Sequence, residues 1–342
     1  MDRLKALVLV DWDSRNGFSL VDELRKNSID CDLMGTNFKL KRWTPFKKYL
    51  IHWPRCFWVS LRAFWRRGNY DWVIAWQQIM GIYFGLFKRL SCSKSPKLFL
   101  PITNIMQRKN RIISFIRKKI TTASWKAVDK IGFFSVPDME RVVSDYDLPA
   151  YKAVHLPFGI NLKKFPSDWI FNLDSYICSV GISYRDYETI IKAAEKIDRQ
   201  FVIVTQQFAL KGLKIPDNVL VYTNTFGRKT QEIMLNASII VLTFKFENCP
   251  AGENCILEAM WYGKPLIVTR TITSIQYIDH GVNGLYVPLK NPEAVVEAIN
   301  YILSNPAKAK DMGYRARRSV EKNYSMEVFG TKVAKIILNE RI

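Results

Sequence analysis

Residues 247–288, ENCPAGENCILEAMWYGKPLIVTRTITSIQYIDHGVNGLYVP, decide the fold of this chain. The order of residue types predicts a loop, a helix, a turn, a buried strand, a second loop and a final strand. Gly263-Lys264-Pro265 is typical of a helix end, because glycine caps a helix and proline cannot continue it. The apolar run Leu266–Val268 indicates a parallel strand buried on both faces. Turn residues at 279–284 then lead into the apolar Leu285–Val287.

The loop before the predicted helix has the features of an anion site. Pro250–Asn254 places Gly252 just before the helix, where free backbone N–H groups and the helix dipole favour a diphosphate. Glu258 lies one to two turns inside, where a carboxylate can accept both hydroxyls of a ribose. A charge within the apolar run Cys255–Met260 is costly without a partner, although a solvated helix carboxylate is the alternative. From this segment we expect donor contacts by Ala251, Gly252, Glu253, Asn254, Cys255 and Glu258.

These residues resemble the family 4 glycosyltransferases of the GT-B superfamily. Members carry a similar Glu-containing helix, a Gly-Lys-Pro turn and an Asp-Gly-Val-Asn-Gly-Leu segment. The similarity extends back to residues 174–181 and 185–194, like the first strand and helix of the family's C-terminal domain, and to 236–242, like the strand before the donor loop. The resemblance implies sugar transfer from a nucleotide-sugar, with retained anomeric configuration, no obligatory metal and no cofactor besides the donor.

The chain departs from the family pattern at two positions. Pro250 stands where many members have a glutamate, so Glu247 or Glu253 would have to face the sugar, and we favour Glu253 because it lies in the loop that closes over the donor. Ile182 replaces an arginine of the family pattern, which leaves Arg185 as the nearest cation for the diphosphate. Alternatively, Arg185 only caps the start of a helix or lies on its surface. None of the three histidines is a convincing catalyst, so the catalytic residue is unknown.

Length and composition indicate a two-domain globular protein. The chain has 342 residues, of which 48% are hydrophobic, enough for two sizeable cores. Its six cysteines show no CxxC pair or metal-ligand spacing, so we expect reduced thiols in a cytoplasmic protein and no metal site. The N-terminal apolar run is too short for a signal peptide, and acidic residues follow it too soon. No run reaches the roughly 18 apolar residues that a spanning helix needs.

The positive charge is concentrated in the first half. Residues 1–150 hold 27 Lys plus Arg against 13 Asp plus Glu, a balance of +14, whereas residues 151–342 hold 24 against 18, a balance of +6. This asymmetry indicates an anionic partner for the N-terminal domain.

The segment Phe38–Gly68 suggests which partner that is, because it has nine basic and nine aromatic residues and no acid. A helix after Pro54 would place apolar side chains, Phe64 among them, opposite arginines and could lie in a lipid headgroup plane. The residues expected to face the membrane are Trp53, Phe57, Trp58, Arg62, Phe64, Trp65 and Arg66. A second patch combines Ile112, Ile113, Ile116 and Ile120 with Arg108, Lys109, Arg111, Arg117, Lys118 and Lys119.

Two alternatives stand beside this membrane hypothesis. The aromatic side of the helix could instead pack on the domain's own sheet, with the arginines in solvent. Aromatic and basic residues together can also bind single-stranded nucleic acid. We do not expect nucleic acid, because no recognisable DNA- or RNA-binding motif accompanies the charge.

Alternating strand and helix patterns predict an α/β protein with two doubly wound, Rossmann-like parallel sheets that face each other across a cleft. The predicted domains are 1–158, which binds the acceptor and faces the membrane, and 159–322, which binds the donor; a helix in 323–342 crosses back. Lys130–Ser135 is expected to be the last strand of the first domain. Ligands bind at the carboxyl ends of such strands. This rule nominates as cleft residues for the acceptor or sugar Asp11, Asp13, Asn16, Gly17, Gln77 and Gln78. We also expect Gly17 to contact the donor. Asp13 could equally be a cap residue.

Three hypotheses follow for the function. The first is a glycosyltransferase, peripheral on the inner face of the cell membrane, that transfers a sugar to a lipid-linked saccharide or another membrane acceptor in polysaccharide or glycolipid biosynthesis. The second is an inactive relic that binds a nucleotide or glycan. The third is a soluble transferase acting on a small molecule or a protein.

Overall fold

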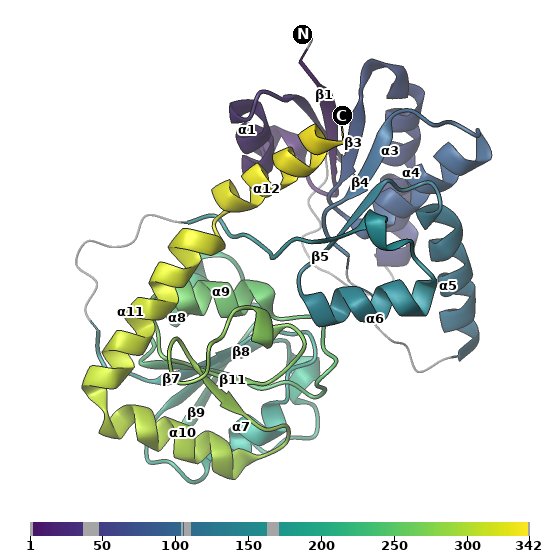
Figure 1. The fold of residues 1–342 in the computed structure, drawn as a ribbon. Coiled ribbons are helices and arrows are strands. Elements are labelled where there is room, and N and C mark those ends of the chain that lie inside the picture. The colour runs from purple at the N-terminus through teal and green to yellow at the C-terminus, as the bar shows by residue number, and fades with distance from the viewer. Residues whose placement is uncertain (1–2, 37–47, 104, 106–110, 163–170, 341–342) are drawn as a thin grey trace. The chain divides into compact units, whose positions relative to one another are not determined.

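The computed structural model describes residues 3–36, 48–103, 105, 111–162 and 171–340. The chain divides into two compact units (Figure 1), each described by itself below. Unit 1 comprises residues 1–159 and 326–342, and unit 2 comprises residues 160–325. The sequence predicts boundaries after residues 158 and 322, and the contacts divide the chain after residues 159 and 325.

Unit 1 contains a six-stranded parallel sheet with strand order β2-β1-β3-β4-β5-β6. Side chains alternate across a strand, so Leu7 and Leu9 of β1 enter one hydrophobic core while Ala6, Val8 and Val10 enter the other. The strands are β1 (Lys5–Val10), β2 (Asp30–Gly35), β3 (Trp72–Ala75), β4 (Lys97–Leu100), β5 (Lys130–Phe133) and β6 (Ala153–His155).

Helices cover both faces of this sheet (Figure 1). One face carries α1 (Ser19–Lys26) and α12 (Met326–Asn339). The other carries α3 (Trp53–Trp65), α4 (Gln78–Leu90), α5 (Arg111–Trp125) and α6 (Val136–Tyr146). Short helical turns are η1 (Ser14–Asn16), η2 (Lys48–His52), η3 (Arg67–Asn69) and η4 (Ala150–Lys152).

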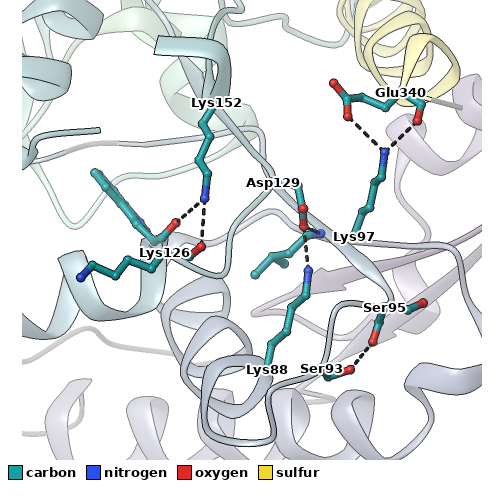
Figure 2. Close-up of polar contacts among 10 residues, drawn as sticks. Lys88, Ser93, Ser95, Lys97, Lys126, Asp129, Lys152 and Glu340 are labelled. Atoms are coloured by element: carbon teal, nitrogen blue, oxygen red, sulfur yellow. Dashed lines mark hydrogen bonds and ion pairs between the residues drawn. The ribbon is translucent and has the colours of Figure 1, made fainter. Parts of the chain in front are cut away.

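The last helix is fixed to unit 1 by a polar cluster at the amino ends of β4 and β5 (Figure 2). Lys97 Nζ donates to the backbone oxygen of Glu340 at 2.7 Å. Lys130 Nζ lies 2.8 Å from the Glu340 carboxylate. Beside them, buried Lys88 pairs with Asp129 at 2.7 Å. Since α12 packs on α1, the C-terminal segment belongs to the core of unit 1 although it follows unit 2 in sequence.

One strand of unit 1 differs from the prediction. The sequence predicts that β5 is the last strand of the first domain. Instead, Ala153–His155 pairs in parallel with Ile131–Phe133 and forms β6 at the sheet edge. A three-residue strand is shorter than the usual five or six, so its hydrophobic pattern is too brief to be recognised.

Unit 2 contains a second six-stranded parallel sheet, with strand order β12-β11-β10-β7-β8-β9. Its strands are β7 (Ile177–Val180), β8 (Phe201–Thr205), β9 (Val219–Thr223), β10 (Ile239–Leu242), β11 (Leu266–Thr269) and β12 (Leu285–Val287). Its helices are α7 (Tyr187–Ala194), α8 (Arg228–Asn236), α9 (Glu253–Trp261), α10 (Pro292–Ser304) and α11 (Pro306–Asn323), with the short turns η5 (Gln207–Leu210) and η6 (Ser274–Gln276).

The two sheets confirm the predicted α/β fold class. In unit 2, α7 and α10 pack on the core that contains Ile177, Ile239 and Ile267, and α8 and α9 contact β7 and β11 respectively. None of the helices in the described part of the chain has both the length and the apolar character needed to span a bilayer.

Candidate functional site

The loop after β10 enters α9 through a glycine. Gly252 is the N-cap residue of α9 and has φ of 107°, a conformation that L side chains rarely adopt. A Cβ added there would also press on the Phe244 ring and lie 3.3 Å from Arg185 Nη1. The N-cap offers no side-chain acceptor to the first turn of α9, so the backbone N–H groups of that turn are suited to an anion.

Arg185 lies directly beside this helix start. It follows β7, is only 5% exposed, and donates from Nε to the backbone oxygen of Val180 at 2.8 Å. Its guanidinium stacks on the Phe244 ring at 4.2 Å. Nη1 is buried and has no hydrogen-bond partner within the described residues. Because a buried donor without an acceptor is costly, this geometry suits an anionic ligand between Arg185 and Gly252.

Backbone and hydroxyl contacts hold the surrounding loops together. The N–H of Asp186 donates to Thr243 O at 3.0 Å, and Thr243 Oγ1 donates to Asp186 O at 2.6 Å. On the other side, Thr273 Oγ1 donates to Cys249 O at 2.9 Å. These bonds join the loops after β7, β10 and β11, so the anion site is shaped before a ligand arrives.

Glu258 is half-buried on α9 and meets α8. Its Oε1 accepts a hydrogen bond from Gln231 Nε2 at 3.2 Å. The carboxylate is therefore held in place by a neighbouring side chain. It is not the freely solvated helix carboxylate that the sequence left as an alternative. Gln231 cannot be identified from the sequence, because nothing in the polar α8 shows which of its side chains meets α9.

The other predicted donor residues surround the same helix start. Ala251 is buried, Glu253 and Cys255 are half-buried, and Asn254 is exposed. Burial raises the pKa of the Cys255 thiol, and Arg185 beside it acts in the opposite direction. The thiol is thus protonated at neutral pH. Glu247 is exposed in the loop after β10.

In unit 1, Asp13 and its neighbours follow β1. Asp13 is the N-cap of η1, and its carboxylate accepts from the backbone N–H of Arg15 at 3.1 Å and pairs with the Arg15 guanidinium at 2.7 Å. The structure thus favours the capping role that the sequence left open. Asn16 and Gly17 are exposed, and Gly17 lies in unit 1 while the other predicted donor residues lie in unit 2.

Gln77 and Gln78 follow β3, the neighbour of β1. Gln77 is the N-cap residue of α4 but makes no side-chain capping bond. Gln78 Nε2 is buried and, within the described residues, has no hydrogen-bond acceptor. An amide donor in this state at the carboxyl edge of the sheet is available to a hydroxyl or carbonyl of a ligand.

A histidine that the sequence analysis sets aside also lies at this edge. His52 is 7% exposed, and its Nε2 lies 3.3 Å from Asp11 Oδ2 and 3.6 Å from Cys56 Sγ. Asp11 directly follows β1, where sequence reasoning nominates it. The spacing of His52 and Cys56 places them on one helix face, but only the fold brings that face to Asp11.

The exposed side of α3, the predicted membrane-facing helix, differs from the predicted one. Phe57 packs edge-on against Tyr83 and Phe87 of α4, and Phe64 packs against Phe84 and Phe87. These two phenylalanines therefore do not face outward, because α4 covers their side of the helix. Trp53 is half-buried. The exposed side chains of the predicted set are Trp58, Arg62, Trp65 and Arg66.

The second predicted patch lies on α5. Phe115, Ile116 and Ile120 are 61%, 52% and 45% exposed, and Lys118 and Lys119 stand among them. Ile112 and Ile113 are also exposed. Residues 38–47, Arg108 and Lys109, which belong to the predicted patches, lie outside the described residues.

Comparison with known proteins places unit 2 in a family. Residues 176–319 match the family model for glycosyl transferases group 1. Trehalose synthase from Pyrococcus horikoshii is 31% identical over 110 residues, which is 31% of this chain and 25% of that protein. The chain thus matches only about a quarter of the length of this curated relative.

Solved structures resemble the whole chain. Anabaena Alr3699/HepE, solved in complex with UDP and glucose, has a TM-score of 0.71 at 13% identity, over 98% of this chain and 100% of that one. WaaG, a glycosyltransferase involved in lipopolysaccharide biosynthesis, has a TM-score of 0.67 at 12% identity, over 97% and 99%. At such low sequence identities, the structural similarity shows the fold alone. Residues 176–319 are accordingly a glycosyl transferases group 1 domain, and the chain as a whole has the GT-B fold.

Proposed function

We propose that this protein is a glycosyltransferase that takes a sugar from a nucleotide-sugar and transfers it to a membrane-associated acceptor, a lipid-linked saccharide. The observation that carries the donor part is Arg185, a buried guanidinium with an unpartnered Nη1 beside the first turn of α9. Glu258, one to two turns further along α9, is the carboxylate for the ribose hydroxyls. HepE, which has a similar fold, was solved with UDP and glucose.

The same residues supply the chemistry of the leaving group. As the bond between sugar and diphosphate breaks, negative charge grows on the diphosphate. The Arg185 guanidinium and the backbone N–H groups of α9 stabilise that charge in a site that already has its shape. We further propose that the transferred sugar retains its anomeric configuration and that the reaction needs no metal, as the family resemblance implies.

Unit 1 supports the membrane part of the proposal. Trp58 and Trp65 of α3 are 57% and 68% exposed, and Phe115 and Ile116 of α5 are exposed as well. Amphipathic aromatic side chains with lysines and arginines favour the interface of an anionic bilayer, where each cation contributes about 1 kcal/mol. WaaG, with a similar fold, takes part in lipopolysaccharide biosynthesis. We place the protein on the cytoplasmic face of the membrane.

Sedimentation with vesicles tests the membrane part. Full-length protein should sediment with vesicles containing anionic lipid and remain in the supernatant with neutral ones. Replacing Phe115, Ile116 and Ile120 by serine should reduce the bound fraction severalfold, whereas Tyr301→Ser, at an exposed apolar residue of unit 2, should not. Equal binding of the triple variant, or failure of wild type to bind, would contradict the proposed surface.

Product formation tests the transfer itself. Incubation with radiolabelled nucleotide-sugars and membrane lipid extract should yield labelled lipid, and Arg185→Met should abolish it. Donor binding without any product would instead favour the relic, which is motivated by Pro250 and Ile182 at positions where the family has charged residues. Transfer to a water-soluble acceptor alone would favour a soluble transferase.

A further inference from the structure

An open groove of about 600 Å³ lies on unit 2, between α11 and the segment 275–283 that follows β11. Its described lining residues all belong to unit 2, and neither Gly252 nor Arg185 of the candidate anion site is among them. Helix α11 packs on α9 (Figure 1), and the groove lies on another side of α11. Ligand sites have volumes of roughly 300–1,000 Å³, so the groove has room for a ligand of several rings.

One wall of the groove is a row of cations on α11. Arg315, Arg318 and Lys322 are exposed and follow one another at helical spacing, about 4.5 and 6 Å apart along the axis. Arg315 pairs with Asp311 at 2.7 Å, and Arg318 lies 3.6 Å from Glu321. Ion pairs between exposed side chains contribute little to stability. The two guanidinium groups can therefore exchange these partners for the acid groups of a ligand.

The facing wall is held in one conformation by polar and aromatic contacts. Tyr324 Oη donates to the backbone oxygen of Gln276 at 2.8 Å, and its ring meets the buried Tyr277 ring edge-on at 5.0 Å. Asn283 Oδ1 accepts from the N–H of Asp279 at 2.7 Å, and Asn283 Nδ2 donates to Tyr277 O at 3.1 Å. These contacts join the end of α11 to the turn that follows η6. The groove is therefore shaped before a ligand binds, which reduces the ordering cost of binding.

The side chains of the groove fit a ligand that carries both acid groups and hydroxyls. Asp279 stands on the wall that faces the cations, where it repels a densely charged polymer but accepts hydrogen bonds from hydroxyls. Asn323 is exposed and adds an amide. Tyr314 is 58% exposed, and the negative face of its ring attracts the C–H groups of a sugar. A surface recessed between two walls does not suit the plane of a bilayer.

We infer that this groove binds an anionic saccharide, in which acid groups are separated by uncharged hydroxyl-bearing units. Its role as a holding site for the acceptor chain rests on the proposed function, whereas the binding itself does not. The groove begins at Ile275, two residues after Thr273, whose Oγ1 donates to the backbone oxygen of Cys249 in the loop before α9. A chain held in the groove stays near that loop, which raises the effective concentration of the acceptor.

The test is calorimetric titration of the full chain with acidic hexasaccharides from hyaluronan and from alginate, in the absence of any nucleotide. At least one of them should bind, and neutral maltohexaose should not. Arg318→Gln and Lys322→Gln should each weaken the binding by about twofold to fivefold. The triple variant that adds Arg315→Gln should weaken it by about tenfold or more.

A matched control separates the groove from the general positive charge of the chain. Lys308, Lys310 and Arg228 are exposed and do not line the groove. Replacing all three by glutamine removes the same charge as the groove triple variant and should leave the affinity unchanged. Tyr314→Ala should weaken the binding of the acidic hexasaccharide, whereas Tyr314→Phe, which keeps the ring face, should retain it.

The inference is overturned if neither acidic hexasaccharide binds wild type, if maltohexaose binds equally well, or if the groove triple variant binds like wild type. Tighter binding of a hexaglutamate peptide would assign the groove to an acidic protein segment instead. Loss of sedimentation with anionic vesicles in the groove triple variant would assign it to the membrane. Because no nucleotide-sugar is present, failure here leaves the donor site intact, and failure of donor binding leaves the groove intact.

Discussion

At the residue scale, the main feature is a cation buried without an anion. Arg185 has a hydrogen bond from Nε, a stacked aromatic ring and a buried Nη1 with no partner in the described part of the chain. No ion pair within that part involves it. A charge in this state costs stability unless a ligand supplies the missing acceptor, and removing the charge should therefore affect ligand binding more than folding.

We predict that Arg185→Met weakens nucleoside diphosphate binding by about 10- to 150-fold, since hydrogen bonds to charged groups contribute about 1.5–3 kcal/mol. The melting temperature should stay equal or rise, because a buried unpaired charge is removed. Calorimetry and thermal unfolding measure the two effects. Arg228→Met, at an arginine of α8 whose side chain is 92% exposed, is the control. A large loss of melting temperature with unchanged affinity would show that Arg185 is structural.

At the scale of elements, the loop from β10 into α9 depends on Gly252. Alanine there must hold a φ of 107° and press on the Phe244 ring. We predict that Gly252→Ala lowers the melting temperature and the donor affinity together, because strained backbone costs about 1–3 kcal/mol and the helix start must shift. Gly212→Ala, at a φ of 82° with open space around it, should lower the melting temperature less and leave affinity unchanged. Equal effects of both substitutions would contradict this account.

The sequence predicts the elements of this site better than the contacts between them. The strand at 266–269 and the helix before Gly263 follow from apolar runs and from glycine and proline, which act locally. The hydrogen bond between Gln231 and Glu258, and the approach of His52 to Asp11, join segments 27 and 41 residues apart. No periodicity encodes such pairs, because they depend on how helices pack on the sheet.

The same limit applies to the two sides of α3. Its amphipathic pattern is clear from the sequence, but the pattern does not show which neighbour covers which side. Phe57 and Phe64 point to α4, which supplies Phe87 to both. The exposed rings are instead those of Trp58 and Trp65.

At the scale of the whole molecule, the chain returns to unit 1 at its end, and Glu340 fixes that return. Lys130 first and Lys97 second hold the pKa of Glu340 below its ordinary value of 4.5, against the opposing effect of burial. A lowered folded-state pKa means that the charged form stabilises the fold above about pH 4.5, and that this contribution is lost as pH falls through the folded-state pKa.

We predict that Glu340→Gln lowers the melting temperature at pH 7 and that the difference from wild type shrinks towards zero as the pH falls below 4. Thermal unfolding followed by circular dichroism across this range measures the effect. Glu297→Gln, at an exposed glutamate of α10, is the control. A difference that persists undiminished at low pH would show that the ion pairs do not cause it.

The function proposed for this protein depends on the binding of a nucleotide-sugar by unit 2 through α9. The most direct measurement is calorimetric titration of a panel of nucleotide-sugars into wild type and Glu258→Ala, with donor hydrolysis followed in parallel. We predict that one donor binds wild type, is hydrolysed slowly, and loses most of its affinity for Glu258→Ala. Absence of binding by every nucleotide-sugar, or equal binding by the variant, would contradict it.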